Sequence, residues 1–215
     1  MLYPDLRQKI AETFRILDEK GLTYGNAGNI SVRIPEENLF LITPSGVRKA
    51  ALKPEDILVI DEKRKVIEGR GHPSIETPMH LAIYKSRKDV KAVIHAHPVY
   101  SSVFAVVGVA IPPVVEEMII LTGGEVEVAK YAPPGTRELA NNVVEALGDR
   151  KAALLMNHGI ITCGKDLEDA LEVLICVERT AKIYLLSKLI GEPKLIPEKV
   201  IEAEKNLYRL KQKYQ

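Results

Sequence analysis

The sequence predicts a layered α/β domain, in which strands and helices alternate along one length of chain. Two observations lead to this prediction. Short apolar runs of strand length alternate with longer runs whose apolar residues recur at helical spacing. No linker rich in Pro, Gly or Ser divides the chain, and it contains no internal repeat or low-complexity segment. Because domains commonly reach about 200 residues before they split, we expect residues 1–215 to form a single domain.

The first part of the chain predicts one helix and then four short strands. Apolar residues recur at helical spacing from Leu6 to Leu17, and Gly21 follows as a stop signal. The turn TYGNAGN then leads into an apolar strand near residues 30–34, and NLFLI predicts a second strand that can pair with it as a hairpin. DILVI and KVIEG predict two further strands on either side of a charged turn.

The rest of the chain alternates between helices and strands. A helix is expected to start within PSIETPMHLAIYKS, with Thr77 as its cap and Pro78 in its first turn. The elements expected after it are a buried strand in VKAVIHAH, a helix opened by Pro98, a helix over 136–148, two strand pieces in AALLMNHGIITCG, a long helix over 166–189 and a last helix over 198–213.

The composition excludes several classes of protein. Hydrophobic residues make up 46% and charged residues 27% of the chain, which is typical of a globular protein and not of a disordered one. Thirty basic against 29 acidic residues leave a formal net charge of +1, so we expect no nucleic-acid partner. The stretch without Asp, Glu, Lys or Arg between Lys91 and Glu116 contains prolines, serines and histidines and predicts a strand and a helix. We therefore expect no membrane span.

The cysteines and the first residues indicate a compartment. Cys163 and Cys176 lie in apolar surroundings and form no CxxC pattern, so we expect two free thiols in a reducing environment. The first ten residues, MLYPDLRQKI, carry charges where a signal peptide needs an apolar core. These features predict a cytoplasmic protein.

Two histidines lie one residue apart at the end of the apolar run KAVIHAHPVY. On a strand, side chains at positions i and i+2 project from the same face, so His95 and His97 can chelate one cation. Two ordinary polar residues at a strand edge would give the same pattern. A catalytic zinc typically takes three protein ligands, and His158, at the end of the apolar strand AALLMN, is the best third ligand. Nitrogen-only coordination suits zinc, although another divalent metal fits as well.

The two remaining histidines have less informative surroundings. His80 lies inside an expected helix beside Met79 and Leu81, so we expect a packed or a surface histidine there. His72 precedes a proline in a polar loop and receives no role.

A carboxylate and three turns complete the candidate site. PSIET places Glu76 just before an expected helix, where it is either a base that moves a proton at carbon or an acid held by the helix dipole, worth about 0.3–1 kcal/mol. The turns GNAGN, TPSG and the Pro-Ser before Glu76 can bind an anion through backbone amides and hydroxyls without any lysine. Each of them, taken alone, is equally well an ordinary turn.

Six segments, taken in order, resemble the class II aldolase/adducin family and, within it, the fuculose phosphate aldolases. They are TYGNAGNISVR, LITPSG, PSIET, HAHP, YAPPGTRELA and LLMNHG, and they run from about residue 10 to about residue 190. The resemblance implies a three-layer α/β/α fold around a largely antiparallel central sheet. It also implies a ring-like homotetramer whose active sites lie between neighbouring subunits.

The resemblance further implies a zinc-dependent lyase. Such an enzyme splits a ketose 1-phosphate, such as fuculose 1-phosphate, into dihydroxyacetone phosphate and an aldehyde such as lactaldehyde, through a metal-stabilised enediolate. His95, His97 and His158 fall on the zinc ligands of the family. Glu76 falls on the acid that moves the proton and that approaches the metal when no substrate is bound. The positions that match phosphate-binding residues, or lie beside them, are Gly28, Asn29, Thr43, Ser45, Gly46 and Ser74.

Several positions depart from the fuculose-type pattern. Ile75 stands where the motif has a second serine before the glutamate, so one phosphate contact is missing or the anion sits differently. Glu117 stands where the pattern offers a tyrosine proton donor, and we expect it to do acid–base work in that place. The C-terminal segment aligns poorly, so Tyr208 and Tyr214 are both candidates for a second donating tyrosine.

Three alternative functions remain open. A ribulose-5-phosphate 4-epimerase relative would use the same retro-aldol step, but those enzymes carry an aspartate at the position of Glu76. A methylthioribulose-1-phosphate dehydratase relative would use a glutamate such as Glu117, but usually lacks an acid at position 76. A non-catalytic adducin-type interaction protein would have lost the histidines, all three of which are present. For an aldolase, fuculose 1-phosphate, a deoxypentulose phosphate and a methylthio analogue all fit the pattern.

Overall fold

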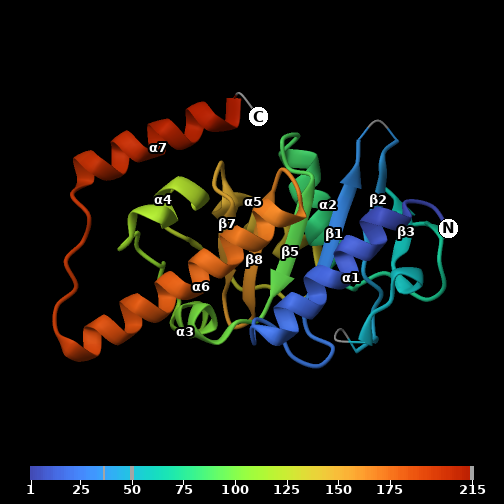
Figure 1. The fold of residues 1–215 in the computed structure, drawn as a ribbon, viewed down its shortest axis with the longest axis horizontal. Coiled ribbons are helices and arrows are strands. Elements are labelled where there is room, and N and C mark those ends of the chain that lie inside the picture. Colours follow the sequence, from blue (N-terminus) through green and yellow to red (C-terminus); the bar gives the residue numbers. More distant parts are fainter. Residues whose placement is uncertain (36, 49–50, 214–215) are drawn as a thin grey trace.

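The computed structural model describes residues 1–35, 37–48 and 51–213, which form a layered α/β structure (Figure 1). The described residues build one eight-stranded sheet with the strand order β4-β3-β2-β1-β5-β8-β7-β6. Every neighbouring pair is antiparallel except β6 and β7, so the expected, largely antiparallel sheet is confirmed. The strands are β1 (Asn29–Ile34), β2 (Leu39–Ile42), β3 (Leu58–Asp61), β4 (Val66–Glu68), β5 (Ala92–Ala96), β6 (Val128–Ala129), β7 (Ala152–Leu155) and β8 (Gly159–Gly164).

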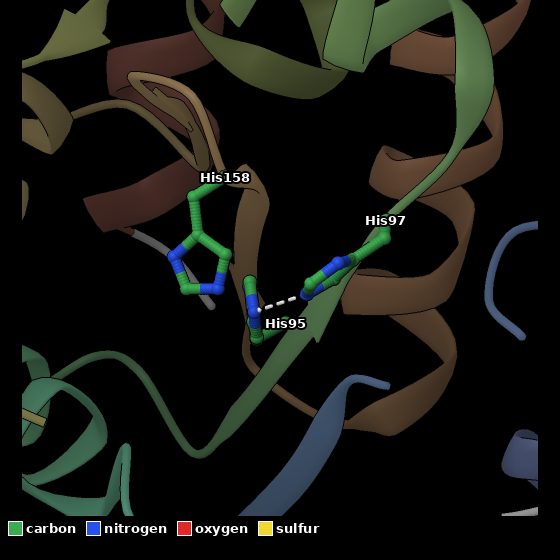
Figure 2. A group of neighbouring side chains, drawn as sticks. All are labelled: His95, His97 and His158. Atoms are coloured by element: carbon green, nitrogen blue, oxygen red, sulfur yellow. Dashed lines mark hydrogen bonds between the residues drawn. The ribbon is translucent and has the colours of Figure 1, made fainter. Parts of the chain in front are cut away.

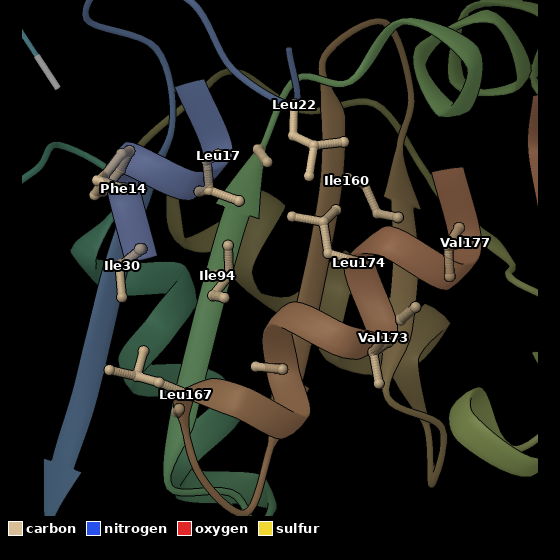
Figure 3. Packing of buried hydrophobic residues seen from close by; sticks show 14 of the residues in the cluster. Phe14, Leu17, Leu22, Ile30, Ile94, Ile160, Leu167, Val173, Leu174 and Val177 are labelled. Carbon is tan, nitrogen blue, oxygen red and sulfur yellow. The ribbon is translucent and has the colours of Figure 1, made fainter. Parts of the chain in front are cut away.

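Helices cover both faces of this sheet and complete the three expected layers. One apolar core lies between the sheet and α1, α3, α4 and α6, and Figure 3 shows α1 and α6 packed over the middle strands. A second core lies between the opposite face and α2 and α5. The helices are α1 (Pro4–Glu19), α2 (Thr77–Ser86), α3 (Val99–Val107), α4 (Glu116–Thr122), α5 (Arg137–Leu147), α6 (Leu167–Ile190) and α7 (Glu198–Lys213), with a short 3-10 turn at Pro54–Asp56.

Strand β1 shows how the alternation of side chains places polar groups next to the candidate site. Ile30 and Val32 point into the core under α1 and α6. The residues that alternate with them, Asn29 and Ser31, are buried on the opposite face and hydrogen-bond to residues 76–84, at α2. Because buried polar side chains require partners, β1 and α2 are joined by specific hydrogen bonds as well as by apolar packing.

Most expected elements form where the sequence places them. Thr136 caps α5 by accepting a hydrogen bond from the N–H of Leu139, and Gly148 ends that helix. The expectation that Thr77 caps α2 is wrong, because the N-cap is Glu76 and the hydroxyl of Thr77 donates instead to the carbonyl of Ser74. The sequence reading also missed α4 and β6. Helix α4 has 7 residues and β6 has 2, too few to produce a clear periodic pattern.

The start of α3 is held by a carboxylate from α6. Both carboxylate oxygens of Glu178 accept hydrogen bonds from the first turn of α3, from the N–H of Tyr100 at 2.8 Å and from the N–H and hydroxyl of Ser101 at 2.7 Å. Helix N-termini leave such N–H groups without intrahelical partners. Glu178 therefore ties the outer helix α6 to the segment that directly follows His97.

Helix α7 returns along the sequence-distant helix α4 after an extended connection from α6 (Figure 1). The ring of Tyr208 packs against Gly123, where an added Cβ would lie 2.7 Å from a ring carbon. The hydroxyl of Tyr208 donates to the carbonyl of Asp149, just before β7, at 2.9 Å. Glycine at position 123 therefore permits the close contact that holds α7.

The structure also bears on the cysteines and on membrane insertion. Cys163 is buried and Cys176 is half-buried, and both are free thiols, as expected. Among the described residues, no helix combines the length and the apolar character that a bilayer span requires.

We expect Gly28→Ala to be much more destabilising than Gly25→Ala. Both glycines have a positive φ, 78° and 57°, so alanine strains the backbone at each position by about 1 kcal/mol or more. At Gly28 the added Cβ would also lie 2.8 Å from the carbonyl oxygen of His95, whereas Gly25 has open space within 4 Å. The clash should cost about 1–3 kcal/mol more in the free energy of unfolding, measured by urea denaturation. Equal losses for the two variants would show that β5 does not constrain this turn.

Candidate active site

Three histidines meet at one end of the sheet (Figure 2). His95 belongs to β5, His97 follows the end of that strand, and His158 lies in the turn between β7 and β8. The ring centroids of His95 lie 4.7 Å from those of His97 and of His158, and the last two lie 5.0 Å apart. One ring nitrogen of each lies within 4.8 Å of the others. The structure thus brings together the three histidines that the sequence selected.

Strand pairing explains why residues so distant in sequence meet. His95 is paired with Ile161 of β8 on one side and with Asn29 of β1 on the other. The turn before β8 can approach the end of β5 because Gly159 has no side chain, since an added Cβ would lie 2.5 Å from the carbonyl oxygen of Ala96. Asn157 supplies the left-handed residue of that turn, with φ 56°. The register of the sheet therefore brings the turn that carries His158 to the end of β5, beside His95 and His97.

Glu76 lies at the N-terminus of α2 with its carboxylate among the histidines. Its Oε2 lies 3.2 Å from Nε2 of His95, and its Oε1 lies 3.3 Å from Nε2 of His158. Oε2 also accepts a hydrogen bond from the side-chain amide of Asn29 at 2.7 Å. The residue is only 6% exposed, and Oε1 is buried without a hydrogen-bond partner. An unpaired oxygen of this kind is costly in a structural role, so it marks Glu76 as a candidate functional group.

The charges of these groups shift one another's pKa values. Burial by itself would raise the pKa of Glu76, but the charge and hydrogen bond of His95, together with the charge of His158, hold that pKa below its usual value. Burial would lower the pKa of His95, but Glu76 and the carbonyl of Ile160 raise it.

The pKa values of His97 and His158 are lowered, whereas the pKa of His95 is raised. Burial and the charges of His95 and His158 lower the pKa of His97 to about 3, and burial and the charge of His95 lower the pKa of His158 to about 4. At neutral pH both rings therefore offer a free lone pair, which is the form that binds a metal.

The donor set and its orientation fit a divalent metal ion. Nδ1 of His95 lies 2.9 Å from the carbonyl of Ile160, and a hydrogen bond donated there leaves Nε2 free to face the other histidines. Nε2 of His97 lies 2.9 Å from that atom. Two nitrogens bound to one tetrahedral zinc lie about 3.3 Å apart, so a small adjustment would accommodate the ion. A carboxylate buried among three imidazole rings also needs a positive charge beside it, which a proton on His95 or a bound cation supplies.

The three expected anion-binding turns lie side by side next to Glu76. Gly28 and Asn29 open β1, and the hydroxyl of Thr43 accepts a hydrogen bond from the N–H of Ile30 at 3.2 Å. The N–H of Ser74 donates to the carbonyl of Thr43 at 3.3 Å, which ties the second turn to the third.

The residues of these turns differ in their exposure. Thr43 and Ser74 are buried, whereas Ser45 and Gly46 are exposed in the second turn. Ile75, which replaces a serine of the family motif, is 64% exposed beside Glu76. The hydroxyl of Ser74 accepts a hydrogen bond from the N–H of Glu76 at 3.3 Å, so part of its hydrogen-bonding capacity is already used within its own turn.

Two of the expected proton donors, Glu117 and Tyr208, lie apart from this group in the described part of the chain. Glu117 is exposed on α4 and, among the described residues, contacts neither Glu76 nor the histidines. Tyr208 is 3% exposed and binds the segment before β7, whereas His158 follows the end of that strand. Burial raises the pKa of Tyr208, which disfavours release of its proton. Tyr214 lies outside the described residues.

The sequence predicted no specific role for His80, which is buried near the site. His80 is fully buried, so the packed alternative is confirmed over the surface one. Its Nε2 lies 2.5 Å from the amide oxygen of Asn29, next to the carboxylate of Glu76. A signal was available, because Glu76, His80 and Tyr84 follow one another at four-residue spacing along one helix face.

Comparisons with known proteins agree with this geometry. A family model described as the class II aldolase and adducin N-terminal domain matches residues 8–185. A 5-deoxy-D-ribulose 1-phosphate aldolase from Bacillus thuringiensis serovar kurstaki is 39% identical over 202 residues, which cover 94% of each chain. The L-fuculose phosphate aldolase of Escherichia coli K12 is 38% identical over 188 residues, which cover 87% of this chain and 86% of that one.

Solved structures lead to the same group of proteins. A structure described as an L-fuculose 1-phosphate aldolase matches with a TM-score of 0.92 and 40% sequence identity, over 97% of this chain and 98% of that chain. The match therefore includes nearly every element described above. By sequence and by structure, this chain belongs to the class II aldolase and adducin family, among its aldolase enzymes.

Proposed function

We propose that this chain is a zinc-dependent aldolase that cleaves a ketose 1-phosphate into dihydroxyacetone phosphate and an aldehyde. The observation that carries the proposal is the carboxylate of Glu76, which is buried among three histidines and has one oxygen without a hydrogen-bond partner. A base in that position can remove a proton from carbon. Relatives named for aldolase activity on deoxyribulose 1-phosphate and on fuculose phosphate support the same substrate class.

The proposed metal ligands are His95, His97 and His158, with one ion for each subunit. A divalent cation held there supplies positive charge that polarises the substrate's carbonyl and hydroxyl oxygens and stabilises the negative charge that develops on them. Zinc is proposed because the three protein ligands are all nitrogens, although other divalent metals bind imidazole as well.

Glu76 is the proposed base, described here in the condensation direction. Its carboxylate removes a proton from the hydroxymethyl carbon of dihydroxyacetone phosphate. The C–H bond breaks, the electron pair remains on the substrate, and an O–H bond forms on Glu76. The nearby histidines lower the pKa of Glu76, so the carboxylate is ionised at neutral pH. The carbon that holds this electron pair then attacks the carbonyl carbon of the aldehyde, which forms the carbon–carbon bond and leaves the electron pair of the broken C=O π bond on the aldehyde oxygen as an alkoxide. Cleavage of the ketose phosphate is the reverse of these steps.

The proposed phosphate site is formed by the three adjacent turns beside Glu76. Backbone N–H groups and hydroxyls in such turns can hold a phosphate without a lysine. Ile75 offers an apolar side chain where a second hydroxyl would otherwise be available, so the phosphate receives one contact fewer. The residues assigned to this site are Gly28, Asn29, Thr43, Ser45, Gly46 and Ser74.

We also propose a homotetramer with the active sites between subunits, in which Glu117 from a neighbour protonates the alkoxide. Val99, Val103, Val106 and Val107 are exposed on α3, which begins two residues after His97, so a neighbour bound there would lie next to the site. Such apolar patches commonly mark protein interfaces. The burial of Tyr208 and its hydrogen bond to Asp149 favour Glu117 over that tyrosine as the donor.

Two broader proposals complete this description of the protein. We propose that residues 1–215 form one class II aldolase/adducin-like domain, since a continuous sheet receives strands from residue 29 to residue 164. We propose the cytoplasm as its location, which the two free thiols support.

Incubation of zinc-loaded protein with dihydroxyacetone phosphate and a panel of aldehydes tests the proposed activity. Mass spectrometry should detect a ketose 1-phosphate with at least one aldehyde, such as lactaldehyde. Glu76→Gln should keep its zinc and lose about 10²–10⁴-fold in rate, because the amide cannot accept the proton. A Glu76→Gln protein with the wild-type rate would remove the assignment of the base.

Two further substrates, ribulose 5-phosphate and methylthioribulose 1-phosphate, separate the alternative functions. Conversion of ribulose 5-phosphate to xylulose 5-phosphate would instead indicate an epimerase. Loss of water from methylthioribulose 1-phosphate without cleavage of a carbon–carbon bond would indicate a dehydratase.

We expect His158→Ala to weaken zinc binding by at least about 100-fold, because one of three ligands is removed. His158 is half-buried in a turn, so the fold should tolerate this change. His72→Ala is the matched control, because His72 is exposed and contributes only its backbone carbonyl to the neighbouring turn. Isothermal titration with zinc measures both affinities. Equal affinities for the two variants would contradict the proposed ligand set.

We expect a solution mass close to four chains of 23.9 kDa, measured by light scattering. Val103→Glu and Val106→Glu together should dissociate the tetramer, because they place charges in an apolar contact. A tetramer that survives these changes would show that α3 does not form the interface.

A further inference from the structure

A stripe of polar side chains on α2 faces a stripe of polar side chains on β1. Glu76, His80 and Tyr84 follow at four-residue spacing, which places them on one helix face. Asn29 and Ser31 follow at two-residue spacing, which places them on one strand face. The two stripes lie in contact and form a continuous chain of hydrogen bonds that ends at the carboxylate of Glu76.

We define the buried relay as the four residues that lead to Glu76 in this series of hydrogen bonds: Tyr84, Ser31, His80 and Asn29. The hydroxyl of Ser31 lies 2.8 Å from the hydroxyl of Tyr84 and 2.7 Å from Nδ1 of His80. Nε2 of His80 lies 2.5 Å from Oδ1 of Asn29, and Nδ2 of Asn29 lies 2.7 Å from Oε2 of Glu76. Each member is at most 3% exposed, so water does not compete for these hydrogen bonds.

The direction of each hydrogen bond follows from its chemistry. Asn29 donates to the carboxylate through its amide nitrogen, so its amide oxygen faces His80. That oxygen can only accept, so Nε2 of His80 carries a hydrogen. A neutral imidazole has a single N–H, so Nδ1 accepts a hydrogen bond from Ser31, which in turn accepts one from Tyr84.

The ring of His80 is neutral because of where it lies. Burial, together with the positive charge of His95, lowers the pKa of His80 to about 3. The relay therefore keeps one arrangement of its hydrogens throughout the physiological pH range.

We propose that the buried relay is a positioning device for Glu76, which keeps Oε2 as a hydrogen-bond acceptor and leaves Oε1 to accept the substrate proton. The inference rests on the proposed function, because it concerns the same carboxylate. A hydrogen on Oε2 would point at the N–H of Asn29, unless that amide turned over and lost its hydrogen bond to His80. Oε1 accepts no hydrogen bond within the described residues, and Nε2 of His158 lies 3.3 Å from it.

The relay changes the role of Asn29. The family pattern assigns this residue to the phosphate, but its oxygen is used by His80 and one of its two amide hydrogens is used by Glu76. A single amide hydrogen remains for an anion. Asn29 therefore positions the base in addition to offering this hydrogen to the phosphate, and His80 acts through it.

The tautomer of His80 can be measured without any activity. In ¹⁵N-labelled protein, the ring-nitrogen chemical shifts of His80 should show a neutral ring with hydrogen on Nε2 between about pH 5 and pH 9. Ser31→Ala removes the donor to Nδ1 and should shift this tautomer equilibrium. Hydrogen on Nδ1 in the wild-type protein would overturn the proposal.

Kinetics test whether the relay acts on the base. The chosen reaction is exchange of the hydroxymethyl proton of dihydroxyacetone phosphate with deuterium from the solvent, followed by NMR in zinc-loaded protein without aldehyde. His80→Leu keeps the approximate bulk but loses the donor, so its kcat should fall about 10–100-fold, with KM and zinc content unchanged. His80→Gln retains an N–H that can reach Asn29 and should recover most of kcat.

A control separates these effects from a general loss of stability. Thr180→Val removes a buried hydroxyl that bonds the carbonyl of Cys176 within α6, away from the relay. It should lower Tm without changing kcat. If His80→Leu does not fold, Ser31→Ala provides the same kinetic test, because it frees His80 to adopt the other tautomer.

The outcomes distinguish this inference from the proposed function. Exchange at the wild-type rate by zinc-loaded His80→Leu would overturn the relay and leave the aldolase proposal intact. A raised KM with an unchanged kcat would place His80 with the phosphate turns and would also overturn the relay. Absence of exchange in the wild-type protein would count against the proposed function, and the ring-nitrogen shifts of His80 would then decide on the relay.

Discussion

The approach of a buried carboxylate to three imidazole rings is the interaction on which this end of the molecule depends. Glu76 is largely removed from water, yet its two oxygens lie within 3.3 Å of nitrogens from His95 and His158. In a medium of low polarity, charges and lone pairs at such distances require compensation. A proton on His95 or a bound cation provides it. The surrounding strands and turns hold these groups in place.

Two glycines allow the backbone to pack closely enough to bring these groups together. Gly28 and Gly159 lie on either side of the end of β5, each so near to a backbone oxygen that a side chain would collide with it. The pairing of β5 with β8 and of β8 with β7 then brings the end of β5 next to the turn that carries His158. The pairing of the strands therefore determines where the histidines lie. Glu76 comes from the N-terminus of α2, in the helical layer that covers one face of the sheet.

The sequence was most informative where a regular pattern and a chemically distinctive residue coincide. The spacing of His95 and His97 predicted that they share a strand face, and the apolar run before His158 predicted its place at a strand end. The features that the sequence did not predict were short elements, such as α4, and details that depend on the local hydrogen bonds of the folded chain. The cap of α2 is an example, since Thr77 bonds to Ser74 and leaves Glu76 as the N-cap.

The sequence also did not predict the hydrogen bond between Asn29 and His80, for a related reason. Each residue belongs to a different element, and the spacing within either element does not show which faces meet. The placement of Glu117 and Tyr208 also could not be anticipated from the chain alone, because their distance from the histidines depends on how α4 and α7 pack.

His97 is anchored from two directions. Its own N–H bonds to the carbonyl of Leu22, in the connection between α1 and β1, and three residues later the clamp of Glu178 begins on α3. Partial loosening of the outer helical layer would therefore shift this imidazole while the sheet stayed intact. On heating, we therefore expect the arrangement of the three histidines to be lost before the secondary structure of the sheet.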